Sequence, residues 1–265
     1  MKKRLDVWLV EKGLAESRSQ AQRLIMAGQV RVGQTIAEKA GQMVDAGTEI
    51  EIIQPARFVS RGGEKLEAAL TSFGLTDLRG KVCVDVGAST GGFTDCLLQH
   101  GAVRVFSVDV GYGVLHWRLR RDERVVVMER TNARYVKGFG EKIDFVTIDA
   151  SFISLKILLP VVRQWFSDQN NGEVIALIKP QFEAGQQEAA RGEGVIRDPQ
   201  IHRQVLKEMV EFCQREGWIV RGLIRSPLTG PKGNIEFLIW LALNGEGLTD
   251  FQSVIEEIIN RPVSS

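Results

Sequence analysis

Short apolar segments alternate with helix-like stretches along most of this 265-residue chain. Segments of this kind, rich in Val and Ile, predict the buried strands of a mostly parallel sheet with helices on both faces. We expect strands at 82–86, 103–108, 125–127, 145–148 and 174–178, and then at 218–224 and 235–243. Because no helix separates the last two segments, they should pair antiparallel. The pattern predicts an α/β fold whose mostly parallel sheet has an antiparallel last strand.

The first 54 residues follow a different pattern and predict a small α+β domain. Apolar residues recur at helical spacing in 5–9, and Ser17 with Gln20 forms a capping box before a second helix. Two short strand-like segments follow, and Pro55 and the paired glycines after it mark a boundary. We therefore expect an N-terminal domain at 1–54, a linker at 55–60 and a larger domain at 61–265.

The sequence indicates where in the cell the protein is located. No run reaches the roughly 18 apolar residues that span a bilayer, and Asp6 and Glu11 interrupt the apolar region that an export signal needs. We expect a cytoplasmic protein without membrane contact. Its three cysteines should be buried, reduced thiols, and the tryptophans at 117, 165, 218 and 240 should lie in the core.

Nucleic-acid binding would have to come from a local patch, because the net charge is only +1. The N-terminal domain offers such a patch, since basic residues gather near its start and on its second helix. These residues could contact phosphates. The candidates are Lys2, Lys3, Arg4, Arg18, Ser19 and Arg23.

The segment between the first strand and its helix has the composition of a cofactor loop. Its small residues allow a ligand to approach the backbone closely, but it lacks the glycine spacing of a dinucleotide-binding loop. Asp85 could hold an ammonium group, and Asp109, at the end of the next strand, could accept ribose hydroxyls. S-adenosylmethionine has both groups and NAD does not, whereas a tight turn without a ligand would leave the two carboxylates unexplained. The expected cofactor residues are Asp85, Gly87, Ala88, Ser89, Gly91, Gly92, Phe93, Asp109 and Asn132.

Four charged residues stand where apolar sequence is expected: Lys65, Asp149, Lys179 and Glu236. Charged residues that follow neighbouring parallel strands meet at the carboxyl edge of the sheet, beside the cofactor loop. Each alone would be a solvated strand end. Together they suggest catalysis, because two nearby ammonium groups favour loss of a proton from one of them, and the neutral amine can act as a base.

These residues and the segments around them resemble one family. The set Lys65, Asp149, Lys179 and Glu236 is similar to the tetrad of FtsJ-like ribose 2′-O-methyltransferases, and four segments are similar to its TlyA branch, also labelled haemolysin A. The segments are Ser60–Leu66, Asp149–Ser154, Lys179–Glu183 and Gly233–Phe237. Arg4–Asp6, Ser17–Ala21 and Gly28–Val32 resemble the S4-type RNA-binding domain of that branch. The linker departs from it, with Arg57–Ser60 where related sequences carry a Trp.

The resemblance implies a Rossmann-like class I methyltransferase sheet, an N-terminal S4-like domain and S-adenosylmethionine as cofactor. It implies methyl transfer to a cytidine ribose 2′-hydroxyl of ribosomal RNA or ribosomal subunits. In this interpretation Lys179 is the base, Asp149 positions it, and Glu236 holds the substrate and Lys65. The long polar segment 183–197 would act as a lid over the substrate.

Other residues could indicate a metal site or a hydrolase, but their patterns do not support either. The three histidines have no companions at metal-ligand spacing, so no metal is expected, and Ser89 lacks the G-x-S-x-G turn of a hydrolase nucleophile. The alternatives are an rRNA-binding assembly factor with weak or lost catalysis, which cofactor binding would distinguish, and a membrane-lytic haemolysin, which liposome leakage would reveal.

Overall fold

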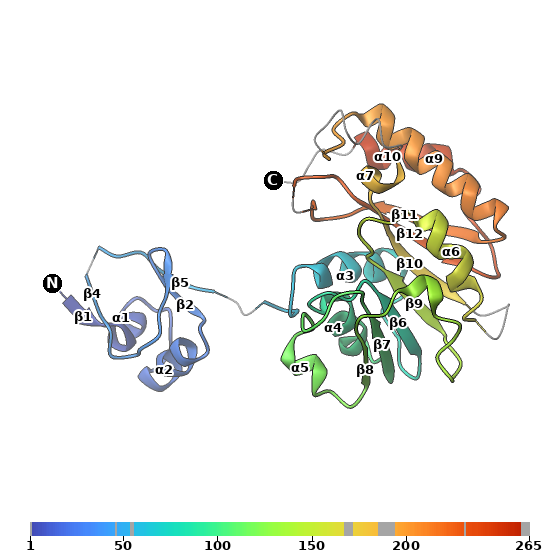
Figure 1. Ribbon diagram of the computed structural model, residues 1–265. Helices are drawn as coiled ribbons and strands as arrows, with labels where there is room; N and C mark the ends of the chain where they lie inside the picture. Colours follow the sequence, from blue (N-terminus) through green and yellow to red (C-terminus); the bar gives the residue numbers. More distant parts are fainter. Residues whose placement is uncertain are drawn as a thin grey trace. The chain divides into compact units, whose positions relative to one another are not determined.

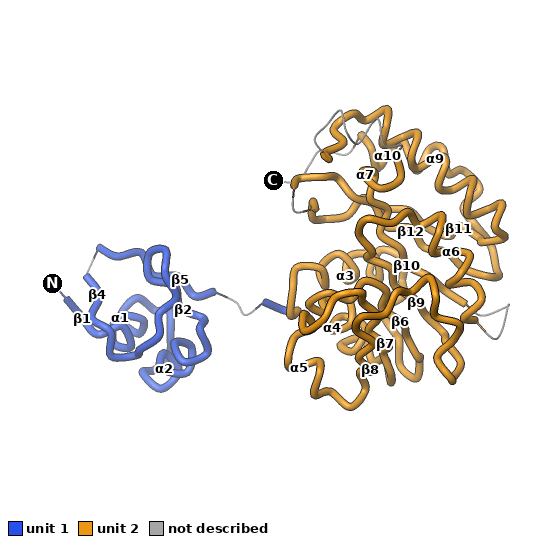
Figure 2. The backbone as a smooth tube through the Cα atoms, viewed as in Figure 1, with its two compact units in different colours: residues 1–57 blue, residues 58–265 orange. Residues whose placement is uncertain are grey.

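The computed structural model describes residues 2–45, 47–53, 56–166, 172–184, 194–230 and 232–260. The chain divides into two compact units, residues 1–57 and 58–265 (Figure 2). The division falls within the segment 55–60. Each unit has its own hydrophobic core.

The N-terminal unit combines two helices with short strands, as the α+β prediction required. Ser17 caps the second helix, where its side chain accepts a hydrogen bond from the amide of Gln20. One face of each helix packs on a small core that includes Leu5, Leu9 and Ile25. The elements are β1 (Lys2–Arg4), α1 (Leu5–Glu11), α2 (Arg18–Met26), β2 (Val30–Val32), β3 (Thr35–Ile36), β4 (Met43–Asp45) and β5 (Ile50–Ile52). Strand β1 pairs with β4, and β2 lies between β3 and β5.

The larger unit contains a seven-stranded sheet in the order β11-β12-β10-β9-β6-β7-β8. Strands β8, β7, β6, β9 and β10 are parallel, whereas β12 is antiparallel to both β10 and β11. The predicted α/β sheet with an antiparallel ribbon at its end is confirmed. The strands are β6 (Val82–Val86), β7 (Arg104–Val108), β8 (Val125–Met128), β9 (Phe145–Ile148), β10 (Glu173–Ile178), β11 (Ile219–Arg225) and β12 (Phe237–Ala242).

Helices cover both faces of this sheet (Figure 1). Successive residues of β6 show the alternation, because Cys83 packs in the core beneath α3 and α4, whereas Val84 packs in the core beneath α6, α9 and α10. The helices are α3 (Gly62–Phe73), α4 (Gly92–Gln99), α5 (Trp117–Arg120), η1 (Ala133–Tyr135), α6 (Leu155–Arg163), α7 (Pro180–Glu183), α9 (Pro199–Arg215) and α10 (Phe251–Asn260). None of the helices in the described ranges is both long and apolar enough to cross a membrane.

Two predictions about individual side chains have different outcomes. The cysteines are all buried and form no disulfide, as expected. Trp165 and Trp218 are buried, but Trp117 is 60% exposed, so its assignment to the core was wrong. Trp117 begins the short helix α5, and the guanidinium of Arg121 lies 5.4 Å from its ring centroid. A solvated cation, instead of apolar side chains, covers that ring.

Candidate active site

Two adjoining cavities lie at the carboxyl edge of the sheet, where β6, β7, β9 and β10 end. The larger is about 620 Å³ and the smaller about 320 Å³. Gly87, Ser89, Asp149 and Ser151 line both cavities. This edge is where parallel α/β sheets bind their ligands, because the loops leaving the strands diverge there.

The loop after β6 requires a glycine at its first position. Gly87 has a φ of +83°, and a Cβ atom there would lie 2.6 Å from the backbone oxygen of Asp149. The loop therefore passes directly against the end of β9. Gly91 has a packing role instead: a Cβ there would lie 2.2 Å from the Leu119 side chain, and Gly91 lines neither cavity.

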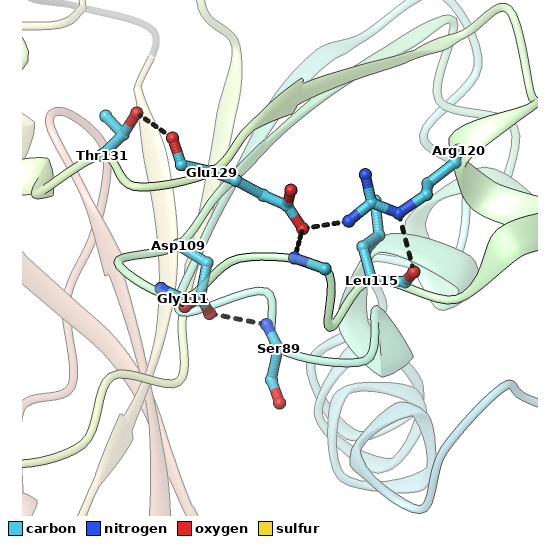
Figure 3. A network of polar contacts seen from close by, with 8 residues as sticks. Ser89, Asp109, Gly111, Leu115, Arg120, Glu129 and Thr131 are labelled. Atoms are coloured by element: carbon cyan, nitrogen blue, oxygen red, sulfur yellow. Dashed lines mark hydrogen bonds and ion pairs between the residues drawn. The ribbon is translucent and has the colours of Figure 1, made fainter.

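Asp109 joins this loop to the end of β7 (Figure 3). One carboxylate oxygen accepts a hydrogen bond of 2.7 Å from the Ser89 amide, and the other accepts one of 2.7 Å from the Gly111 amide. Two bonds leave acceptor capacity on a carboxylate, which can take about four. Asp109 thus fixes the shape of the larger cavity and can still accept hydroxyl groups from a ligand.

The loop that follows Asp109 is held in place by Glu129, the residue after β8. Glu129 accepts a hydrogen bond of 2.9 Å from the Gly113 amide and pairs with the Arg120 guanidinium. Arg120 in turn donates to the backbone oxygen of Leu115 over 3.1 Å (Figure 3). These contacts hold the segment that follows Asp109 in a defined conformation.

The remaining cofactor candidates divide between the cavities. Asn132 lines the larger one, where its side chain accepts a hydrogen bond of 3.1 Å from the Arg134 amide. Ala88, Gly92 and Phe93 line the smaller one.

Asp85 does not lie where the sequence interpretation placed it. Its side chain is fully buried and lines neither cavity. Its carboxylate accepts hydrogen bonds from the hydroxyls of Thr94 (2.7 Å) and Thr147 (3.1 Å). Strand alternation is the reason, since Asp85 points to the same face of β6 as Cys83, beneath α4. Burial raises the pKa of Asp85 to about 7. A carboxylate in this place supports the loop from below and cannot reach an ammonium group in the cavity.

The four charged candidates do come together. Lys65, Asp149, Lys179 and Glu236 all line the smaller cavity. They form two ion pairs: Lys65 Nζ lies 2.5 Å from Glu236 Oε2, and Lys179 Nζ lies 2.6 Å from Asp149 Oδ1. Lys179 Nζ also donates to the Ser151 hydroxyl over 2.9 Å. Two lysine–carboxylate pairs thus share one small, polar cavity, which Arg61 also lines.

Different elements supply these four side chains. Lys65 lies in the first turn of α3, Asp149 follows β9, and Lys179 follows β10 at the start of α7. Glu236 precedes β12 by one residue, so it is not within that strand as the sequence interpretation had it. Lys65, Lys179 and Glu236 are at most 9% exposed. Charged groups this deep need partners, and here each lysine has a carboxylate.

Two residues near the cavities had no clear signal in the sequence. The Glu183 carboxylate accepts hydrogen bonds from the Ser154 hydroxyl (2.6 Å) and the Leu155 amide (2.7 Å), which ties α7 to the start of α6. Burial raises the pKa of Glu183. Phe152 has a φ of +63°, is 90% exposed at the larger cavity and packs against Phe182. An aromatic side chain held in the open in a strained conformation suggests a ligand contact.

The predicted RNA patch of the N-terminal unit is partly committed to internal contacts. Asp6 is fully buried and receives Arg4 (3.1 Å) and Arg18 (3.0 Å), and Lys3 pairs with Glu11 at 2.5 Å. The guanidinium groups of Arg4 and Arg18 remain about half exposed. Asp6 thus holds two arginines side by side at the surface. The other predicted members, Lys2, Ser19 and Arg23, are also exposed.

The predicted lid at 183–197 falls mainly outside the described residues, which omit 185–193. It stays a prediction. On its far side Asn234 donates to the backbone oxygen of Gly194 (2.9 Å) and accepts from the amide of Ile196 (2.9 Å). Asn234 thus anchors the end of the segment, and it precedes Glu236 of the smaller cavity by two residues.

Each of the two units matches a known protein family. The FtsJ-like methyltransferase family matches residues 58–243, and the S4 domain family matches residues 3–50. The chain is 49% identical over 269 aligned positions to the YqxC protein of Bacillus subtilis, covering 99% of this chain and 93% of that protein. It is 43% identical to the 16S/23S rRNA (cytidine-2′-O)-methyltransferase TlyA of Mycobacterium tuberculosis, covering 93% of this chain and 94% of that protein. A solved hemolysin-named structure from Streptococcus thermophilus is 43% identical and has a TM-score of 0.73, covering 97% of this chain and 94% of that one.

Proposed function

This chain belongs to the FtsJ-like methyltransferase family and carries an S4 domain, and from this premise we propose that it methylates ribose 2′-hydroxyls of ribosomal RNA with S-adenosylmethionine. The observation that carries the proposal is the pair of lysine–carboxylate contacts in a cavity that shares Gly87, Ser89, Asp149 and Ser151 with the larger one. Methyl transfer requires a site for the reacting hydroxyl directly beside a site for the methyl donor, and the two adjoining cavities offer both.

The larger cavity fits the cofactor. Its volume of about 620 Å³ lies within the range of small-molecule sites. Gly87 admits close approach to the backbone, the spare acceptor capacity of Asp109 suits ribose hydroxyls, and the Asn132 amide suits an adenine edge. When bound, S-adenosylmethionine supplies a methyl group on a positively charged sulfur, which needs no metal to activate it.

In the smaller cavity Lys179 is the proposed base. The neutral amine of Lys179 takes the proton of the ribose 2′-hydroxyl and becomes an ammonium ion, which Asp149 and the Ser151 hydroxyl hold in position. Lys65 and Glu236 together bind the same hydroxyl and its neighbour on the ribose. Each buried lysine faces a carboxylate, so a neutral sugar can enter the cavity without leaving either lysine unpaired.

The S4 domain is the proposed RNA anchor. The exposed arginines held by Asp6 and the basic face of α2 bind phosphates, which gives affinity and orientation without reading the base. The M. tuberculosis relative is named for cytidine. We extend that target to this chain, and with it ribosomal RNA as the partner.

The direct test uses ribosomal RNA and ribosomal subunits from a host strain that lacks this chain. Purified protein and methyl-labelled S-adenosylmethionine should add label at one or a few riboses, which then resist alkaline cleavage on their 3′ side. Cofactor binding without any transfer would favour the alternative of an RNA-binding assembly factor. Label on bases alone would overturn ribose methylation.

A further inference from the structure

Away from both cavities, α3 and α4 bring together three side chains that ligate metal ions in proteins. Glu67 lies on α3, Cys96 lies on α4, and His100 is the residue that caps the C-terminus of α4. Their ligand atoms all lie within 4.8 Å of one another. Cys96 and His100 lie four positions apart, a companion spacing that the sequence prediction of no metal left out, and Glu67 precedes Cys96 by 29 positions.

The hydrogen bonds of His100 fix the direction of its ring. Its Nδ1 lies 2.7 Å from the backbone oxygen of Thr76, and its Nε2 lies 2.6 Å from Glu67 Oε2. With Nδ1–H donating to the Thr76 oxygen, Nε2 is the ring nitrogen that faces Glu67, and it is the atom with which His100 would bind a metal ion.

The third side chain also belongs to a residue type that binds zinc. Cys96 is fully buried, and its Sγ lies 3.7 Å from Glu67 Oε2. A zinc ion bound by sulfur at about 2.3 Å and by nitrogen and oxygen at about 2.0 Å separates its ligand atoms by roughly 3.3–3.8 Å. The Cys96–Glu67 distance matches this spacing, whereas His100 and Glu67 form a direct hydrogen bond of 2.6 Å, so ion binding requires the partly exposed Glu67 carboxylate to move away from His100 by about 1 Å.

The outer contacts also suit a metal ligand. A ligating histidine usually donates its other N–H to a backbone carbonyl, which fixes the ring and its tautomer, and Thr76 supplies that carbonyl here. The side chains of His100 and Glu67 are 11% and 19% exposed, so solvent reaches one side of the cluster. Water can therefore complete a four-coordinate site.

We propose that Glu67, Cys96 and His100 form a site for a divalent cation of the zinc type, with water as the fourth ligand. On binding, the Cys96 thiol releases its proton to solvent and its sulfur bonds the ion. The ion joins α3, which carries Lys65, to the end of α4, which begins at the cofactor loop. Its role is to stabilise the packing of these two helices, and it takes no part in the chemistry of the cavities.

Calorimetric titration of zinc into the chelator-treated, tag-free full chain tests this proposal. We expect one ion per chain with a submicromolar Kd. Cys96→Ser and His100→Gln should each weaken binding by at least about tenfold, whereas Cys213→Ser, at a buried thiol in the other core cluster, should not change it. Cobalt bound to the unaltered chain should show a thiolate charge-transfer band, which is independent of how well the variants fold. If no saturable binding occurs, or if Cys96→Ser and His100→Gln bind zinc as tightly as the unaltered chain, the three side chains form a hydrogen-bonded cluster only and the proposal is wrong.

Discussion

The two units of the chain bury charge in different ways. In the described part of the N-terminal unit, Asp6 is the buried charged residue, and Arg4, Arg18 and Gln22 all donate hydrogen bonds to it from the surface side. In the larger unit, two buried lysines and their carboxylate partners, of which Glu236 is buried and Asp149 partly exposed, face a cavity of about 320 Å³. A buried carboxylate with several cationic donors organises a surface. Ion pairs that line a cavity, in contrast, remain accessible to a ligand.

The largest stability effect is expected at Asp6. The Arg4 guanidinium, with Gln22 and Arg18, holds the pKa of the Asp6 carboxyl well below its usual range. Asp6→Ala should destabilise the N-terminal unit by about 3 kcal/mol, because it leaves a cavity and removes the centre of the network. Because the folded pKa is lowered, this stabilisation exists above about pH 4 and is lost as the pH falls further.

Peptide-resolved hydrogen exchange in α1 and α2, corrected for the intrinsic rate at each pH, measures this loss. Glu51→Ala is the matched control, since Glu51 pairs with Arg31 at the surface and its removal should cost under about 1 kcal/mol. Equal losses for the two variants would remove the distinction between buried and exposed pairs.

A second test separates the units themselves. The chain from Phe58 onward should keep its affinity for S-adenosylmethionine but lose roughly a hundredfold in affinity for ribosomal RNA, because the phosphate contacts of the S4 domain are gone. The dependence of RNA binding on salt should become less steep for the same reason. RNA binding as tight as that of the full chain would show that the larger unit alone supplies the affinity.

Asp85 should give the opposite pH dependence to Asp6. Its folded pKa is raised to about 7 by burial, so its contribution to stability is greatest below about pH 4 and is lost as the pH rises through 7. Asp85→Asn cannot ionise. The stability of this variant relative to the unaltered chain should therefore increase by about 3 kcal/mol between pH 5 and pH 8. Denaturant unfolding followed by tryptophan fluorescence measures it, and parallel curves for the two proteins would contradict the buried position of Asp85.

The smallest effect concerns the cofactor. Asp109→Ala should weaken S-adenosylmethionine binding by about tenfold, because it removes an acceptor and frees the Ser89 and Gly111 amides that shape the cavity. Asp144→Ala is the matched control, since this carboxylate accepts a backbone hydrogen bond from Val82 at the opposite edge of the sheet. Calorimetry with both variants decides the point, and equal affinities would exclude Asp109 from the site.

The sequence predicted the sheet better than the details of its edge. Apolar runs such as 145–148 match a strand to the residue, because a buried strand must be apolar along its whole length. The antiparallel ribbon followed from the missing crossover. The meeting of Lys65 with Glu236 was suggested by strand ends and family resemblance together. Strand ends alone could not have given it, because Lys65 lies on α3.

Side-chain direction was the main source of error. Asp85 was assigned to the ligand from its place before Gly87, although the alternation of β6 turns it toward Thr94. Arg4 and Arg18 can both pair with Asp6 only because the start of α2 packs beside the start of α1. Glu67 likewise reaches His100 only because α3 packs against α4. Neither contact has a local pattern, so neither could be read from spacing.

Single-turnover methyl transfer to ribosomal RNA tests most directly whether Lys179, in the smaller cavity, is the catalytic base. Lys179→Ala should slow transfer by at least about a thousandfold, while S-adenosylmethionine affinity stays unchanged. The melting temperature should fall, because Asp149 loses its buried partner, so transfer is measured at a temperature at which the variant is fully folded. Lys81→Ala should keep the full rate, because Lys81 forms a comparable pair with Glu173 (3.0 Å) at the opposite edge of the sheet. A Lys179→Ala enzyme whose rate stays within about tenfold of the unaltered chain would contradict the account, since a general base contributes more than that.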